Sequence, residues 1–172
     1  MYKKYDVNEN YFEKIDSQEK AYILGFIYAD GYNREDLLEL VQIESRKDIL
    51  EKIIKALEYN GPIKEYTPGK FTVNICSTKL CSDLTKLGAI RNKSLTLEFP
   101  DFISKSLMPS FILGYFDGDG CIWTGKRKKM IVKDKKYVSG FRERIVHNVK
   151  ITFTGNFNFI NSLQDYLIDS GV

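Results

Sequence analysis

Two aspartates occupy the same unfavourable position in this sequence, and together they could hold a metal ion. Asp30 and Asp119 each end an apolar stretch and precede a glycine, in ILGFIYADG (23–31) and ILGYFDGDG (112–120). The second stretch begins 89 positions after the first, and five of the nine residues are identical. Both stretches predict helices, and a carboxylate at a helix C-terminus is disfavoured by about 0.3–1 kcal/mol because it meets the negative end of the helix dipole. The recurrence of this placement indicates a functional role.

Small residues on both predicted helices indicate how the aspartates could meet. Gly25 and Ala29 lie four positions apart on the first helix, as do Gly114 and Gly118 on the second, so each pair shares one helix face. Helices packed through these four interface residues approach closely, and the two aspartates then converge. Paired carboxylates favour a hard divalent cation such as Mg²⁺, which suits phosphodiester hydrolysis. If only one motif were present, helix packing would explain its small residues and a simple turn would explain its Asp-Gly pair. Because the motif occurs twice, a metal site is the favoured interpretation.

Basic residues are concentrated in one segment of the chain. The net charge is +3, but residues 126–150 hold ten basic and two acidic residues. The segment therefore carries +8 and the other 147 residues carry −5, which suggests a polyanionic partner such as nucleic acid. A solvated lysine-rich hairpin is the alternative. The candidate DNA-binding residues are Lys126, Arg127, Lys128, Lys129, Lys133, Lys135, Lys136, Arg142, Arg144 and Lys150.

The apolar periodicity and the turn residues predict a mixed α/β (α+β) fold. The N-terminal half reads as helix, strand pair, helix, strand pair and helix, with Asp16 and Glu19 as a capping box and Gly31 as a left-handed cap for the first helix. Residues 147–171 parallel residues 39–61 as a strand, a turn, a helix and a glycine. The second copy has 21 extra residues, which fall in the basic segment and predict an enlarged basic hairpin.

With these features the sequence resembles the two-motif, single-chain LAGLIDADG homing endonucleases. The two nonapeptides resemble the family's two motifs, and LTKLGAIRNKSLTLEFP (84–100) resembles the stretch before the second motif in bacterial and phage members. The resemblance covers nearly the whole chain. It implies two pseudo-symmetric αββαββα repeats that pack through their motif helices, with antiparallel sheets that form a DNA-binding saddle.

The resemblance also implies a site-specific endonuclease that hydrolyses both strands of DNA with Mg²⁺ or Mn²⁺. Asp30 and Asp119 match the family's metal-binding aspartates, and the main-chain carbonyls of Ala29 and Gly118 match its supporting ligands. Lys93 matches a basic residue that supports cleavage; the second such residue has no counterpart in this chain. In the family, water attacks the phosphodiester without a covalent enzyme intermediate, and cleavage leaves four-base 3′ overhangs.

The same resemblance predicts the domain boundaries. Residues 1–92 form the first repeat, 93–108 a connector and 109–172 a second repeat that lacks its last hairpin and helix. Because a sheet without two of its strands exposes an edge, we expect a chain truncated at its C-terminus.

Tyr28 replaces the acid common at the sixth motif position, which Asp117 keeps; we interpret this change as tolerable. We expect a monomer on duplex DNA, with a dimer or fragment complementation as the alternatives for a truncated chain.

Other classes of protein fit less well. Three cysteines without a CxxC pair and a single histidine, His147, argue against a disulfide framework and a Cys/His zinc site. No apolar stretch approaches the ~20 residues that span a bilayer, and the N-terminus lacks a signal region, so we expect a cytoplasmic protein without a membrane partner, encoded in an intron or free-standing.

The main alternative is a DNA- or RNA-binding protein that no longer cuts, such as a maturase or regulator. Trp123 is expected to anchor the basic hairpin by packing, with stacking on a base as the alternative.

Overall fold

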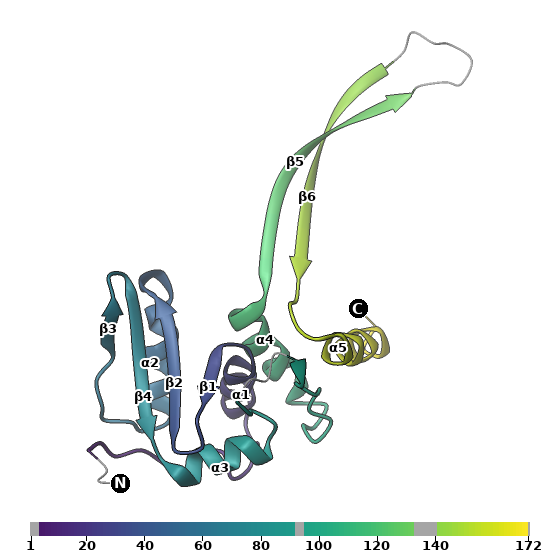
Figure 1. The fold of residues 1–172 in the computed structure, drawn as a ribbon. Helices are drawn as coiled ribbons and strands as arrows, with labels where there is room; N and C mark the ends of the chain where they lie inside the picture. Colours follow the sequence, from purple (N-terminus) through teal and green to yellow (C-terminus); the bar gives the residue numbers. More distant parts are fainter. Residues whose placement is uncertain (1–3, 92–94, 133–140, 172) are drawn as a thin grey trace. The chain divides into compact units, whose positions relative to one another are not determined.

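The computed structural model describes residues 4–91, 95–132 and 141–171, and it divides the chain into two compact units. The main unit comprises Met1–Asp119 and Thr154–Val172, and the hairpin unit comprises Gly120–Phe153 (Figure 1). Both contain antiparallel strands, so the mixed α/β architecture with antiparallel sheets is confirmed. The pseudo-symmetry of the two repeats and the boundaries at residues 92 and 108 remain predictions.

The main unit is built around a four-stranded antiparallel sheet. Its strands follow the order β1-β2-β4-β3, and each of the three neighbouring pairs is antiparallel. Leu38 and Leu40 of β2 are fully buried, as are Val73 and Ile75 of β4, because alternate residues of a strand share one face. The elements in this part of the chain are β1 (Gly31–Asn33), β2 (Leu37–Ile43), the short helix η1 (Glu44–Arg46), α2 (Lys47–Ala56), β3 (Lys64–Thr67) and β4 (Lys70–Cys76).

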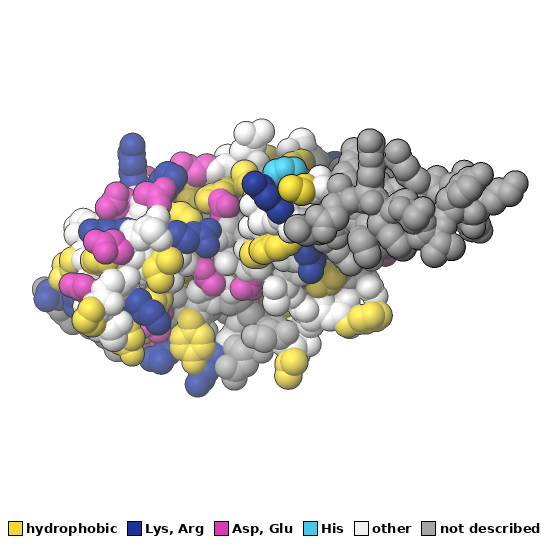
Figure 2. Space-filling model, turned by 90° about the horizontal axis from the view of Figure 1, so that it is seen from above, with side chains coloured by type: hydrophobic (Ala, Val, Ile, Leu, Met, Phe, Trp, Pro, Cys, Tyr) yellow, Lys and Arg dark blue, Asp and Glu magenta, His cyan; other side chains and the backbone are white. Residues whose placement is uncertain are grey.

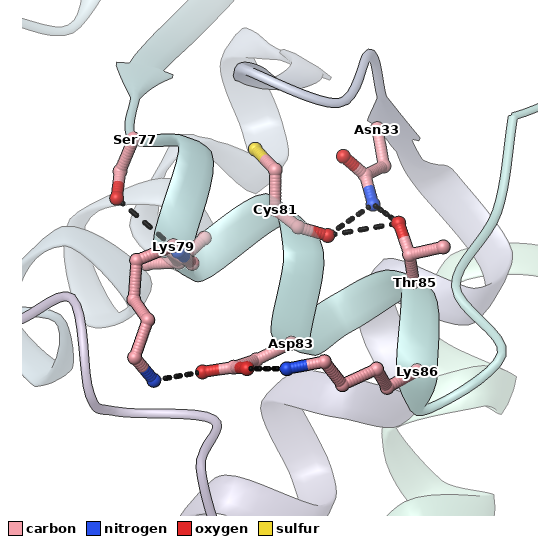
Figure 3. A network of polar contacts seen from close by, with 8 residues as sticks. Asn33, Ser77, Lys79, Cys81, Asp83, Thr85 and Lys86 are labelled. Atoms are coloured by element: carbon pink, nitrogen blue, oxygen red, sulfur yellow. Dashed lines mark hydrogen bonds and ion pairs between the residues drawn. The ribbon is translucent and has the colours of Figure 1, made fainter.

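Helix α3 (Thr78–Lys86) follows the sheet and is held by buried polar side chains (Figure 3). Its N-cap is Ser77, whose hydroxyl accepts from the backbone N–H of Leu80 at 3.2 Å. Asn33, 3% exposed, donates its amide to the carbonyls of Cys81 and Ala89 at 3.0 and 2.9 Å. The last residue of β1 is thereby tied both to the middle of α3 and to the residues that follow the helix.

Two helices from the C-terminal part of the chain complete the main unit. They are α4 (Met108–Asp119) and α5 (Phe157–Asp169). The ring of Phe159 on α5 packs against Tyr115 on α4 with ring centroids 4.4 Å apart, and against Phe99 at 5.6 Å. Asn156 caps α5 by accepting from the N–H of Phe159 at 2.9 Å. No helix within the described part of the chain is long and apolar enough to cross a membrane.

The hairpin unit consists of two long antiparallel strands, β5 (Cys121–Val132) and β6 (Phe141–Thr152). Their pairing runs without a bulge from Cys121 opposite Thr152 to Val132 opposite Phe141. Each strand has twelve residues, whereas β1, which follows the other motif, has three. This is the enlarged hairpin that the 21 extra residues predicted.

Two predictions about the ends of the first motif helix, α1 (Gln18–Asp30), were wrong. Its N-cap is Ser17, which accepts from the N–H of Lys20 at 3.2 Å; Asp16 instead pairs with the Lys20 ammonium at 2.9 Å. Gly31 is extended, with φ −78° and ψ 142°, and not left-handed. The reason is that β1 begins at Gly31 itself, so the chain passes from helix to strand without a reversing residue.

Candidate active site

The helices α1 and α4 pack against each other backbone to backbone. A Cβ built on Gly25 of α1 would overlap the carbonyl oxygen of Phe111, and one on Gly114 of α4 would overlap that of Tyr22. The Cβ on Gly114 would also lie 3.0 Å from the backbone N of Phe26, which is tighter than ordinary van der Waals contact. The structure therefore places both predicted interface glycines at the contact, where any side chain would force the helices apart.

The same contact continues to the C-terminal ends of the two helices. A Cβ on Gly118 would overlap that of Ala29 and would lie 3.5 Å from the backbone N of Asp30. Asp30 follows Ala29 in the chain, and Asp119 follows Gly118. Because the residues that precede them are in contact, the two aspartates leave the helix pair at the same end.

The Asp30 carboxylate is held by a buried glutamine. Gln42 of β2 donates its side-chain amide to Asp30 Oδ2 at 2.6 Å, and Gln42 is only 7% exposed. Asp30 itself is partly exposed. The hydrogen bond fixes one carboxylate oxygen, Oδ2, and with it the orientation of the carboxylate.

A second carboxylate at this end of the helix pair is held by two residues from the N-terminal part of the chain. The Tyr22 hydroxyl of α1 donates to Asp117 Oδ2 at 2.6 Å, and the Arg46 guanidinium donates to the main-chain carbonyl of Asp117. Burial, and then the hydrogen bond to Asp117, raise the pKa of Tyr22 above its ordinary value, so the phenol stays a donor. Arg46 also places a positive charge at the C-terminus of α4, where it stabilises the helix dipole.

Asp119 lines a pocket of about 280 Å³ at the end of α4. Burial, and then the negative charge of Asp119, raise the pKa of Tyr115, and the Tyr115 hydroxyl donates to the carbonyl of Thr154 at 2.7 Å. Ala29 lines the same pocket, so the pocket reaches the point where the two motif helices meet. Its lining residues are Tyr28, Ala29, Leu97, Tyr115, Asp119, Thr154, Gly155 and Asn156.

The donor set at this end suits a divalent cation that keeps much of its water. Within residues 4–91, 95–132 and 141–171, no three Asp, Glu, His or Cys side chains gather into a metal-binding group. The protein ligands at hand are the carboxylates of Asp30 and Asp119 and the carbonyls of the last helical turns, which lack intrahelical partners. Mg²⁺ is commonly bound by one or two carboxylates with waters in its other positions. The residues present therefore fit Mg²⁺ and do not fit a site made of protein side chains alone.

The predicted DNA-binding residues belong to the hairpin unit. Lys126 and Lys150 are exposed; Lys126 pairs with His147, and Lys150 pairs with Trp123. Side chains of the other basic residues in β5 and β6 lie outside the described residues, as do Lys93 and the segment 133–140. The residues concerned are Arg127, Lys128, Lys129, Lys133, Lys135, Lys136, Arg142 and Arg144.

Sequence reasoning missed three side chains at this site: Gln42, Tyr22 and Arg46. A signal for Gln42 was present, since residues 38, 40 and 42 share one face of β2 and the first two are buried leucines. A glutamine at the third position of such a line needs a polar partner. Tyr22 and Arg46 carried no comparable signal, because nothing in the sequence indicates that residue 46 lies beside residue 117.

Comparisons with known proteins find likenesses among solved structures alone. No protein-family model matches this chain, and no curated protein matches it. Among solved structures, it is similar to the crystal structure of the I-LtrWI LAGLIDADG homing endonuclease bound to target DNA, at 14% sequence identity and a TM-score of 0.43. The match covers 81% of this chain and 66% of the other, so the chain spans just under two thirds of that protein.

Proposed function

We propose that this protein is a DNA endonuclease of the LAGLIDADG homing type, which cuts both strands of a specific duplex site with Mg²⁺ or Mn²⁺. The observation that carries the proposal is the backbone contact of α1 and α4, with Ala29 against Gly118. This contact brings Asp30 and Asp119 to one end of the helix pair. The ten basic residues between Lys126 and Lys150 would supply the positive charge that binding of a polyanion requires.

Each residue of the site has a distinct part in the proposed reaction. Asp30 and Asp119 would hold the cation, which, when bound, activates water and stabilises the leaving oxygen. Gln42 orients the Asp30 carboxylate through its hydrogen bond at 2.6 Å. Arg46 and Tyr22 fix the last turn of α4 through Asp117, and so fix the position from which Asp119 projects. The groups are thus arranged before DNA binds, which lowers the free energy needed to orient them in the transition state.

Cleavage of a randomised duplex library tests the proposal. The protein is incubated with the library and Mg²⁺, and new ends are sequenced. We expect discrete ends with four-base 3′ overhangs, abolished by EDTA and by either Asp30→Asn or Asp119→Asn. Asp165→Asn is the matched control, because Asp165 is an exposed aspartate on α5 and should leave cleavage unchanged.

A parallel binding measurement separates cutting from binding. Fluorescence anisotropy with labelled duplex DNA should show binding by the wild type and by both aspartate variants, since neutralising a carboxylate does not weaken contacts to phosphates. Binding without cleavage by the wild type, with Mg²⁺ present, would contradict the endonuclease and favour a non-cutting DNA- or RNA-binding protein on the same scaffold. Absence of binding to any duplex at low salt would contradict the endonuclease and a DNA-binding protein alike, and would leave only the RNA-binding alternative.

A further inference from the structure

The register of the hairpin unit divides its residues into two lines of different character. One line contains Ile122 opposite Ile151 and, two residues along, Val149. These side chains are 60%, 60% and 68% exposed, and Ile145, also on this line, is 59% exposed. Successive residues of a strand face opposite sides, so these four apolar side chains belong to one line, which we call the apolar line although Lys126 and Lys128 also lie on it.

The other line is basic and contains the single tryptophan. Trp123 pairs with Lys150, and Gly125 pairs with Asn148. Seven basic residues lie in β5 and β6, and the register puts five of them at positions in line with Trp123. These five are Arg127, Lys129, Arg142, Arg144 and Lys150, whereas Lys126 and Lys128 belong to the apolar line.

Trp123 is held against its own strand but is not buried. A Cβ built on Gly125 would overlap the six-membered ring of the indole and lie 2.8 Å from its Cζ3 atom. The ring therefore occupies the space that a side chain at position 125 would need. The indole is nevertheless 53% exposed. Contact with Gly125 restricts the rotamers of Trp123, so less conformational entropy is lost when a ligand covers the exposed part.

We propose that Trp123 is a base-stacking residue, which receives a nucleobase exposed where a DNA strand is unpaired or unstacked. This inference rests on the proposed function, since it assigns a contact within the DNA-binding surface. An aromatic side chain beside a cation is the arrangement with which proteins bind exposed bases, the ring under the base and the cation on the phosphate. Lys150, exposed and directly opposite Trp123, is the cation. The faces of bases in an intact duplex are covered by their neighbours, so such a duplex offers the indole only base edges.

Because the chain has one tryptophan, its emission reports on this contact alone. The full chain is titrated with three probes at low salt: oligo(dT), a duplex with a central unpaired bubble, and the same duplex fully paired. Anisotropy of a label on the DNA measures binding in each titration. We expect all three probes to bind, and we expect quenching of the Trp123 emission by oligo(dT) and the bubble duplex but not by the paired duplex.

Variants test the energetic share of the contact. Trp123→Leu should weaken binding of oligo(dT) roughly 5- to 150-fold, the range that corresponds to the loss of one stacked base, and Trp123→Phe should restore part of it. Ile122→Ala is the matched control, because Ile122 is the adjacent residue and is similarly exposed, but belongs to the apolar line. It should leave binding of all three probes unchanged. Circular dichroism verifies that each variant is folded.

The outcomes separate this inference from the proposed function. Binding of all probes with unchanged Trp123 emission, or equal quenching by the paired duplex, would overturn stacking and leave the DNA-binding function standing. Equal losses in Trp123→Leu and Ile122→Ala would overturn it as well. Failure of every probe to bind would remove the proposed function, and the stacking role with it.

Discussion

The two motif ends of this molecule carry similar sequences but are supported differently. Asp30, at the end of α1, accepts a hydrogen bond from Gln42 of β2, within its own half of the chain. Asp117, in the last turn of α4, is held by Tyr22 and Arg46, which also belong to the N-terminal half. The motif is therefore repeated, but the side chains found to hold both motif ends come from residues 22–46.

The difference has a physical reason in the sheet that follows α1. Four strands bury Leu38 and Leu40 completely, so a polar side chain on the same line, such as Gln42, is fixed in position and reaches the helix end. Arg46 follows β2 directly, in η1. A rigid buried layer beneath the site lets short polar side chains hold carboxylates in defined positions, which loops alone do less well.

The largest expected effect comes from forcing the two motif ends apart. Gly114→Val adds atoms where the Tyr22 carbonyl already lies, and a backbone carbonyl inside a helix cannot move aside. We expect a loss of at least about 3 kcal/mol in the free energy of unfolding, and loss of cleavage even where the protein remains folded. Urea unfolding followed by circular dichroism measures the first effect.

Leu113→Ala is the control for that substitution. Leu113 is the preceding residue of α4 and is 54% exposed, so its truncation should change stability by no more than about 0.5 kcal/mol. Equal destabilisation by the two substitutions would contradict a helix contact that depends on glycine.

Local periodicity and turn residues were sufficient to predict the helices, the strand pairs and the enlarged hairpin, whereas the antiparallel sheets were expected from the family resemblance. Two glycines with positive φ stand at such turns: Gly88, with φ 89°, follows α3, and Gly69, with φ 75°, lies in the β3–β4 turn. The N-cap of α1 is Ser17 and not the predicted Asp16, one residue earlier. Both residue types are good N-caps, and Asp16 instead forms an ion pair with the Lys20 ammonium. Local rules do not rank such neighbouring candidates.

The candidate site was predicted only in part, and for a different reason. The glycine spacing on α1 and α4 is a local pattern, and the close contact that it implies appears in the structure. The partners of the carboxylates depend on which surfaces the fold brings together: Gln42 and Asp30 are 12 residues apart, and Arg46 and Asp117 are 71 apart. No local rule contains that information.

A smaller effect is expected from loosening one motif end without moving the helices. Gln42→Leu removes the hydrogen bond to Asp30 while keeping a buried side chain of similar size. Loss of such a supporting partner typically lowers metal affinity or activity by about 10–100-fold. We expect the Mg²⁺ concentration for half-maximal cleavage to rise, and excess Mg²⁺ to restore part of the rate.

Thr72→Val provides the control on the neighbouring strand. Thr72 of β4 is 5% exposed, and its hydroxyl has no hydrogen-bond partner among the described residues, so a valine of the same shape should be neutral or stabilising. It should also leave the Mg²⁺ dependence unchanged. If Thr72→Val shifted the Mg²⁺ dependence as much as Gln42→Leu does, any substitution of a buried residue in the sheet would alter the site. The effect of Gln42→Leu could then not be assigned to the orientation of Asp30.

The smallest effect tests the ion pairs within α3 (Figure 3). Asp83 is 5% exposed and pairs with the Lys79 and Lys86 ammonium groups at 2.5 and 2.9 Å. The hydrogen bond from Lys79 holds the pKa of Asp83 below its ordinary value, against the opposing effect of burial. A depressed carboxyl pKa stabilises the fold above the unfolded pKa of about 4, and this stabilisation is lost as the pH falls through the folded pKa.

Asp83→Asn should therefore lower the free energy of unfolding by about 1 kcal/mol at pH 7 and by less at pH 3. The effect is this small because both lysines are partly exposed, so solvent screens the ion pairs.

Asp48 is the matched comparison: it forms an i,i+4 pair with Lys52 at 2.9 Å, but both side chains are more than 60% exposed. Asp48→Asn should change stability by about 0.5 kcal/mol or less. On the face that Figure 2 shows, acidic and basic side chains of the described residues lie among one another. A loss for Asp83→Asn that is equal at pH 7 and pH 3 would show that packing, and not the ion pairs, accounts for the role of Asp83.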